Sequence, residues 1–237
     1  MEAKRFLKIF GLQKLTLLDY PGKVACTVFT GGCNLRCPFC HNASLVNGHR
    51  DCEAISEEAF FTFLAKRRGI LDGVCISGGE PLLQPDLESF LRRIKELGYL
   101  IKLDTNGCFF ERLKTLVTQG LVDYVAMDLK SSSKDYSSAT GIPDVNLSAI
   151  RESIEFLSKD TVDSEFRTTV VRGLHDSVIL QEAAQMIRGA KRYFLQKFVD
   201  SGNLVGSGMS AFSDEEMETF LNVVTPYVKT AALRGCQ

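Results

Sequence analysis

Three cysteines lie within one short loop, in the segment TGGCNLRCPFCHN at residues 30–42. Cys33, Cys37 and Cys40 have the spacing C-x3-C-x2-C, and the preceding glycines permit the tight backbone of such a loop. Because thiolates are metal ligands, clustered cysteines indicate a metal centre. Three thiolates could hold a [4Fe–4S] cluster with one iron left open, or a zinc ion with His41 as the fourth ligand.

Other chemically capable residues follow predicted strands. The glycines among them let the backbone approach an ammonium or a carboxylate closely. The acidic residues can bind a cation or ribose hydroxyls, and the lysine can bind a carboxylate. These residues are Gly78, Gly79 and Glu80 in SGGEP (77–81), Asp104, Thr105 and Asn106 in LDTNG (103–107), and Asp128 and Lys130 in MDLK (127–130).

Alternating strand-like and helix-like segments must position these residues. β-Branched runs predict strands at 24–30, 73–77, 99–105, 124–128, 166–171 and 193–199. Apolar residues three and four apart predict helices at 56–68, 86–97, 109–119, 147–158, 178–189 and 213–223. Such βα units imply an α/β fold with a mostly parallel sheet and outer helices, either an open sheet or a partial (β/α)6 barrel. Ligands bind at the C-terminal ends of the strands in both, where the motifs lie.

Charge and composition exclude several function classes. Lys and Arg number 28 and Asp and Glu number 29, so no overall field favours nucleic acid or an anionic membrane. No apolar run approaches the ~20 residues that span a bilayer, and the N-terminus has no signal-peptide pattern. We therefore expect a cytoplasmic protein with reduced thiols. We also expect one domain over residues 1–237, with its core at about 20–200, an N-terminal extension and a C-terminal helical segment.

The cysteine loop resembles the C-x3-C-x-aromatic-C signature of the radical S-adenosylmethionine enzymes, with Phe39 as the aromatic residue. SGGEP is similar to that family's GGE segment, and the βα units match its partial barrel. The resemblance implies that Cys33, Cys37 and Cys40 hold a [4Fe–4S] cluster whose open iron binds S-adenosylmethionine. In that family the reduced cluster passes an electron to the sulfonium, and the resulting 5′-deoxyadenosyl radical takes a hydrogen from the substrate.

The motif LDYPGK (18–23), followed by the cysteine loop, SGGEP, LDTNG and MDLK, resembles the activating enzymes of glycyl radical proteins, especially of anaerobic ribonucleoside-triphosphate reductases. The resemblance extends over roughly residues 10–173. It implies a glycyl radical enzyme as the partner, an anaerobic reductase above all. It also implies a low-potential electron donor such as flavodoxin or ferredoxin.

The same resemblance assigns roles to residues on the strand ends. Asp104, Thr105 and Asp128 are expected to hold a monovalent cation and the cofactor, and Lys130 the cofactor's carboxylate or ribose. Arg167 or Arg172 is expected to contact the cofactor, depending on strand register. The remaining expected cofactor contacts are Phe39, Gly78, Gly79, Glu80, Asn106 and either Gln196 or Phe198.

Two other functions stay open at this level: a radical enzyme acting on a small molecule such as a deazapurine precursor, and a zinc-stabilised adaptor. His41 could shield a cluster by hydrogen bonding or make a loop contact. His49 and His175 are expected to be surface loop residues. The thiols of Cys26, Cys75 and Cys108 are expected to be buried in or beside strands, and those of Cys52 and Cys236 to be surface thiols.

Overall fold

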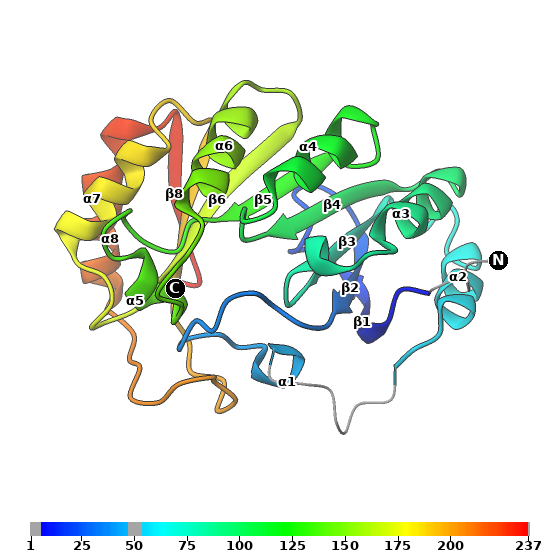
Figure 1. The fold of residues 1–237 in the computed structure, drawn as a ribbon, viewed down its shortest axis with the longest axis horizontal. Coiled ribbons are helices and arrows are strands. Elements are labelled where there is room, and N and C mark those ends of the chain that lie inside the picture. The colour runs from blue at the N-terminus through cyan, green and yellow to red at the C-terminus, as the bar shows by residue number, and fades with distance from the viewer. Residues whose placement is uncertain (1–5, 47–53, 237) are drawn as a thin grey trace. The chain divides into compact units, whose positions relative to one another are not determined.

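The computed structural model describes residues 6–46 and 54–236 and confirms the α/β fold with a mostly parallel sheet (Figure 1). The eight strands are ordered β1-β2-β3-β4-β5-β6-β7-β8, an open order in which β1 and β8 are the edges. The strands are β1 (Ile9–Thr16), β2 (Ala25–Thr30), β3 (Gly73–Gly78), β4 (Leu100–Thr105), β5 (Tyr124–Asp128), β6 (Asp163–Val170), β7 (Arg192–Lys197) and β8 (Thr230–Arg234).

Helices follow most strands, as expected for a βα series. They are α1 (Ala43–Val46), α2 (Glu57–Ala65), α3 (Leu87–Glu96), α4 (Phe110–Thr118), α5 (Tyr136–Thr140), α6 (Leu147–Ser158), α7 (Ser177–Met186) and α8 (Asp214–Val224), with 3-10 turns η1 (Pro81–Leu83) and η2 (Thr225–Tyr227). Every strand and helix predicted from the pattern is confirmed, with ends that differ by a few residues. None of the helices in the described ranges has the length and apolar character needed to cross a membrane.

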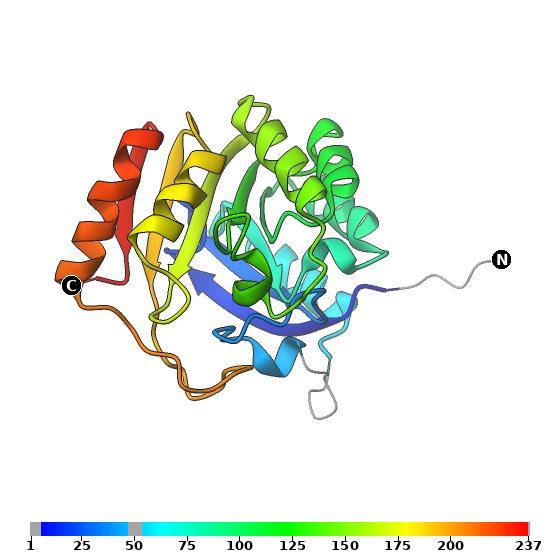
Figure 2. The ribbon, with the colours of Figure 1, turned by 60° about the vertical axis from the view of Figure 1, so that its left-hand side comes forward.

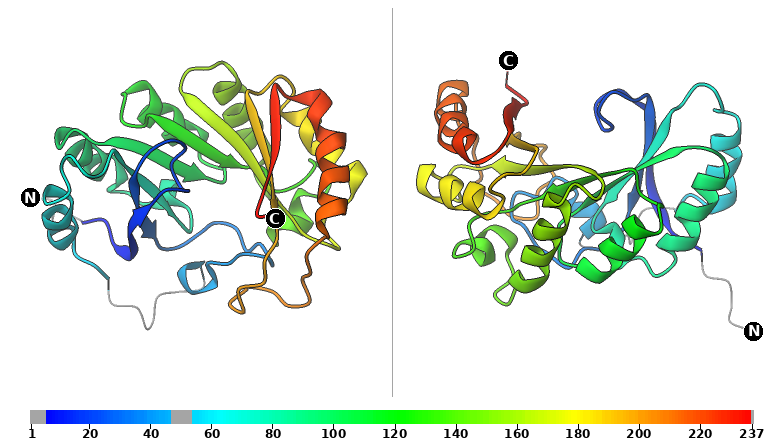
Figure 3. Two further views of the ribbon diagram at one scale, coloured as in Figure 1. Left: turned by 180° about the vertical axis from the view of Figure 1, so that it is seen from behind. Right: turned by 90° about the horizontal axis from the view of Figure 1, so that it is seen from above.

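The two edge strands are absent from the predicted series. β1 runs antiparallel to β2, as Figure 3 shows from behind, and β8 runs parallel to β7. β1 contains Gly11 and exposed polar residues, and β8 begins Thr-Ala-Ala, so neither has a strong β-branched pattern. A third difference is α5, which lies outside the predicted series of helices.

Two compact units divide the chain. Unit 1 comprises Met1–Asn34, Ser44–Thr105 and Glu111–Val125, and unit 2 comprises Leu35–Ala43, Asn106–Phe110 and Ala126–Gln237. The segments of the two units alternate along the sequence. The expectation of one domain stays a prediction.

Each unit has its own packing. In unit 1, Tyr20 and Tyr124 pack around Cys75, with ring centroids 5.8 Å apart. Cys26 and Cys75 are fully buried, as predicted, and burial raises the pKa of each thiol to about 12. In unit 2, α7 and α8 lie side by side next to β7 and β8 (Figure 2).

Candidate active site

The Gly-Gly-Glu segment in unit 1 is bonded to the backbone that opens the cysteine loop. The Gly79 N–H donates to the Thr30 carbonyl at 3.0 Å, and the Glu80 N–H donates to the Gly32 carbonyl at 2.8 Å. A Cβ on Gly79 would lie 1.9 Å from the Gly32 oxygen, and one on Gly78 would lie 2.2 Å from the Thr30 oxygen. Both positions therefore require glycine, because any side chain would separate the two segments.

Glu80 is fully buried, and its carboxylate has local partners. It accepts a hydrogen bond from the Leu82 N–H at 3.0 Å, which caps η1, and another from Thr105 Oγ1 at 2.9 Å. These bonds fix the end of β3 against the end of β4. Direct binding of a cofactor by Glu80 or Thr105 stays a prediction.

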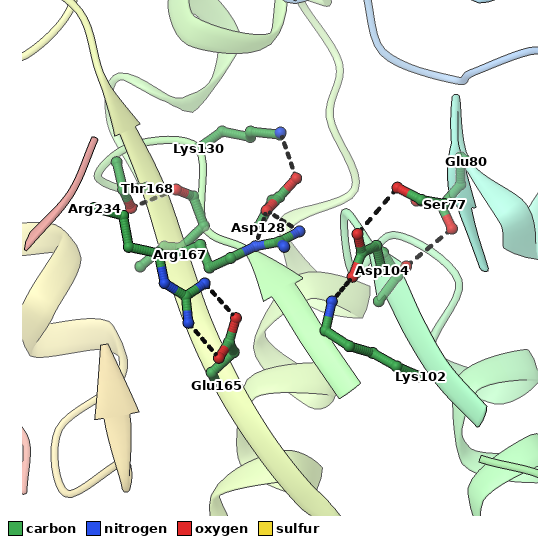
Figure 4. A network of polar contacts seen from close by, with 12 residues as sticks. Ser77, Glu80, Lys102, Asp104, Asp128, Lys130, Glu165, Arg167, Thr168 and Arg234 are labelled. Atoms are coloured by element: carbon green, nitrogen blue, oxygen red, sulfur yellow. Dashed lines mark hydrogen bonds and ion pairs between the residues drawn. The ribbon is translucent and has the colours of Figure 1, made fainter. Parts of the chain in front are cut away.

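Asp104 lies at the end of β4 in unit 1 and is paired with a lysine from its own strand. The Lys102 ammonium forms an ion pair with one carboxylate oxygen of Asp104, and Ser77 Oγ donates to the other at 3.0 Å (Figure 4). Lys102 is 1% exposed, so this is an interior charge pair. No role of Lys102 was predicted from the sequence.

Asp128 ends β5 in unit 2 and has two cationic partners. Arg167 Nε donates to Asp128 at 2.9 Å, and the Lys130 ammonium donates at 3.0 Å (Figure 4). Burial alone would raise the pKa of the carboxyl, but the two cations outweigh it and lower the pKa to about 2. Asp128 is therefore ionised at any pH at which the protein would work.

Lys130 lies beside the cysteine loop within unit 2. Its ammonium is 6.0 Å from the centre of the Phe39 ring. Burial disfavours its charge, but Asp128 and the thiols of Cys37 and Cys40 overcome this effect and raise the lysine's pKa above its ordinary value. The ammonium therefore places a positive charge beside this part of the loop. This part of the loop therefore fits an anionic iron–sulfur centre.

The three loop cysteines differ in exposure: Cys37 is buried, and Cys33 and Cys40 are half-buried. The Cys40 N–H donates to the Cys37 carbonyl at 3.0 Å, which closes a turn between them. In the part of the chain that the structure describes, no three His, Cys, Asp or Glu side chains are grouped closely enough to hold one metal ion. Cluster binding by Cys33, Cys37 and Cys40 stays a prediction that their number and spacing support.

The expectation that His175 is a surface residue is wrong. His175 is 4% exposed, and its Nδ1 accepts from the Val171 N–H at 3.0 Å. The proton is then on Nε2, which donates to the Lys130 carbonyl at 2.9 Å. The ring also packs edge-on against Phe39, with centroids 6.4 Å apart. Burial lowers the pKa of His175, so this neutral ring connects the Lys130 segment to the end of β6. His49 lies outside the described residues.

Four further predicted residues lie in unit 2. The Asn106 side chain accepts from the Cys108 N–H at 3.0 Å and closes a local turn. His41 packs against Phe198 with ring centroids 5.6 Å apart, and burial lowers its pKa. Gln196 is half-buried on β7, opposite Thr169 on β6. Their contacts with a cofactor stay predictions.

The two candidate arginines are in different environments. The Arg167 side chain is 14% exposed and pairs with Asp128, whereas the Arg172 side chain is 47% exposed and pairs with Glu216 at 2.6 Å. Of the two, Arg167 is bonded to a predicted site residue.

Comparisons with known proteins show the family to which this chain belongs. The family model of the radical SAM superfamily matches residues 27–185. A protein of Methanocaldococcus jannaschii, provisionally named a glycyl-radical enzyme activating enzyme, is 32% identical over 197 residues, which are 80% of this chain and 79% of the relative. The pyruvate formate-lyase-activating enzyme of Clostridium pasteurianum is 34% identical over 141 residues, 56% of this chain and 57% of the relative.

A solved structure has the same fold. The crystal structure of Streptococcus suis SuiB bound to S-adenosylmethionine superposes with a TM-score of 0.68 and 16% identity, covering 87% of this chain and 49% of SuiB. The matched family is one of enzymes, which argues against the zinc-stabilised adaptor. The chain belongs to the radical SAM superfamily and, within it, to the glycyl-radical enzyme activating enzymes.

Proposed function

We propose that this chain cleaves S-adenosylmethionine and installs a glycyl radical on a partner enzyme, an anaerobic ribonucleoside-triphosphate reductase. One observation in particular supports the chemistry: the half-buried Lys130 ammonium pairs with the Asp128 carboxylate at 3.0 Å and lies 6.0 Å from the ring of Phe39 in the cysteine loop. The order of the cysteine loop, LDTNG and MDLK supports the activating role, together with the relative from M. jannaschii.

The chain's own residues would bind and orient the cofactor. When bound, a [4Fe–4S] cluster on Cys33, Cys37 and Cys40 would supply the electron that splits S-adenosylmethionine into methionine and a 5′-deoxyadenosyl radical. Lys130 would pair with the carboxylate or ribose of S-adenosylmethionine, while Asp128 would hold the Lys130 ammonium in place. Phe39, packed between Lys130 and His175, would keep water from that side of the loop.

The chemistry supplied there would move a hydrogen atom from a glycine Cα of the partner to the 5′-deoxyadenosyl group, which would leave 5′-deoxyadenosine and a glycyl radical. An activator acts on the partner as a macromolecule, so turnover requires that second protein. A low-potential donor such as flavodoxin or ferredoxin would reduce the cluster in a cytoplasmic setting. A radical enzyme with a small substrate would turn over without a protein partner.

Arg167 and Arg172 form a matched pair for testing cofactor binding. We expect Arg167→Met to weaken S-adenosylmethionine binding about tenfold or more, because it removes a charge-assisted hydrogen bond worth roughly 1.5–3 kcal/mol from Asp128. Arg172→Met should change the dissociation constant by less than about twofold, because exposed ion pairs contribute little. Equilibrium binding to the anaerobically reconstituted protein measures both. Equal losses in the two variants would contradict the role of Arg167.

The deciding experiment for the function is anaerobic. The reconstituted protein is mixed with S-adenosylmethionine, a strong reductant and a candidate anaerobic ribonucleoside-triphosphate reductase, and the EPR spectrum and 5′-deoxyadenosine are recorded. We expect a glycyl radical doublet in the partner and 5′-deoxyadenosine formed alongside it. A partner with the radical-bearing glycine replaced by alanine is the control and should give no doublet.

Two results would change the proposal. Formation of 5′-deoxyadenosine without a doublet would retain the radical chemistry and reject this reductase as the partner. No cleavage of S-adenosylmethionine, with the cluster present and reduced, would reject the proposed activity itself.

A further inference from the structure

Unit 1 carries a row of polar side chains along one face of its parallel strands. The strand register places Thr27, Cys75 and Lys102 side by side on β2, β3 and β4. Ser77 and Asp104 lie two residues further along β3 and β4, and side chains two apart on a strand share a face. Lys102 therefore lies on the same face of the sheet as Asp104, two residues farther from the C-terminal end of the strand.

Lys102 reaches its partner along the strand. Two strand residues span about 7 Å, a distance that an extended lysine side chain covers. Its ammonium pairs with one carboxylate oxygen of Asp104, and Ser77 Oγ donates to the other oxygen at 3.0 Å. The lysine is 1% exposed, and the Asp104 side chain is 17% exposed. A buried ammonium is stable only when it is paired, so this contact is a fixed part of the strand end.

This pairing conflicts with one expectation from the resemblance, a monovalent cation bound by Asp104, Thr105 and Asp128. The Lys102 ammonium already brings a unit positive charge to the Asp104 carboxylate. A second cation at the same carboxylate would be repelled by the first at short range in a poorly hydrated interior. The Asp104 carboxylate therefore does not fit an additional monovalent cation.

We propose that the Lys102 ammonium replaces the monovalent cation, so that this chain binds S-adenosylmethionine without a metal ion at Asp104. The ammonium has the same charge as sodium or potassium and donates up to three hydrogen bonds to oxygen atoms. Because it is covalently attached, its occupancy does not depend on the ion concentration. The effect on cofactor binding rests on the proposed function, whereas the replacement of an ion at Asp104 does not.

The test compares wild type with Lys102→Met in chlorides of tetramethylammonium, sodium and potassium at equal ionic strength. Tetramethylammonium is too large for a compact oxygen site. For the reconstituted protein, the melting temperature and the dissociation constant of S-adenosylmethionine are measured in each salt. Wild type should show less than about a twofold difference in affinity among the salts. Lys102→Met should bind about tenfold more weakly in tetramethylammonium and recover in potassium or sodium with a saturable dependence, as for coupled binding sites.

Two further variants make the result specific. Lys95→Met removes another lysine of unit 1 that is paired with a carboxylate, Asp123 at 2.8 Å, and should show no preference among the salts. The double variant Lys102→Met with Asp104→Asn removes both charges, so it should fold and lose the ion dependence that the single variant gains.

Several outcomes would overturn the proposal. A wild-type protein that requires potassium or sodium would do so. The proposal would also be wrong if Lys102→Met bound S-adenosylmethionine equally poorly, or were unfolded, in every salt while the double variant folds. The ion pair would then be structural only. If wild type binds no S-adenosylmethionine in any salt, the proposed function fails, and the melting temperatures of the variants still decide whether an ion replaces Lys102.

Discussion

Replacement of Cys33, Cys37 or Cys40 by alanine is expected to abolish both iron incorporation and cleavage of S-adenosylmethionine. The loop supplies three thiolates, and a [4Fe–4S] cluster with one open iron needs all three. Loss of one thiolate leaves a second iron without a protein ligand, so the cluster is neither held nor presented correctly. Iron and acid-labile sulfide per chain, with 5′-deoxyadenosine formation after anaerobic reconstitution, measure the effect.

Cys236→Ala is the matched control for these variants. Cys236 is half-buried near the C-terminus, and its neighbours include Asp214 and Lys197, not a cluster residue. This variant should keep wild-type iron, sulfide and cleavage. If a loop variant such as Cys40→Ala retained iron and cleavage at wild-type levels, the assignment of the cluster to this loop would be wrong.

The sequence predicts the fold well wherever the hydrophobic pattern is strong. All the central parallel strands and the longer helices follow from β-branched runs and from apolar spacing, whereas the short helices α1 and α5 do not. The edge strands β1 and β8 escape this method because an edge strand is partly solvated and pairs on one side only. Its pattern is then set by the neighbouring strand, β2 or β7, which the local sequence does not contain.

The candidate site is predicted by residue type but not by pairing. The sequence identifies Asp104, Asp128 and Lys130 as groups at strand ends, whereas it does not show which charges neutralise them. Lys102 was detectable in principle, because it lies two residues before Asp104 on the same strand face, but a lysine in a strand is more often exposed. His175 could not be identified, because its partners Val171 and Lys130 are brought to it by the fold.

The glycines of SGGEP are a case in which the structure changes the reason for a prediction. From the sequence, these glycines are predicted to let the backbone approach a cofactor closely. In unit 1, they allow β3 to approach the backbone of residues 30–32, where the cysteine loop begins. The segment and the loop therefore depend on one another even before a cofactor is bound.

Gly79→Ala is accordingly expected to prevent cluster assembly although it removes no ligand. Its Cβ would lie 1.9 Å from the carbonyl oxygen of Gly32 and 2.6 Å from the carbonyl carbon, and backbone atoms cannot rotate away as a side chain can. Overpacking of this kind costs roughly 1–3 kcal/mol and forces backbone shifts. Here the shift would displace the residue next to Cys33 and break the Glu80 N–H to Gly32 bond of 2.8 Å.

Gly120→Ala separates this local effect from a general loss of stability. Gly120 has a φ of +68° and nothing within 4 Å of an added Cβ, so alanine is strained there by about 1–2 kcal/mol without touching the loop. In a chain of this size each kcal/mol lowers the melting temperature by about 2–4 °C, so both variants should melt earlier by comparable amounts. Only Gly79→Ala should also lose iron and S-adenosylmethionine cleavage. Equal iron content in the two variants would mean that the cysteine loop tolerates displacement at Gly32, and that the close packing of the two segments serves stability alone.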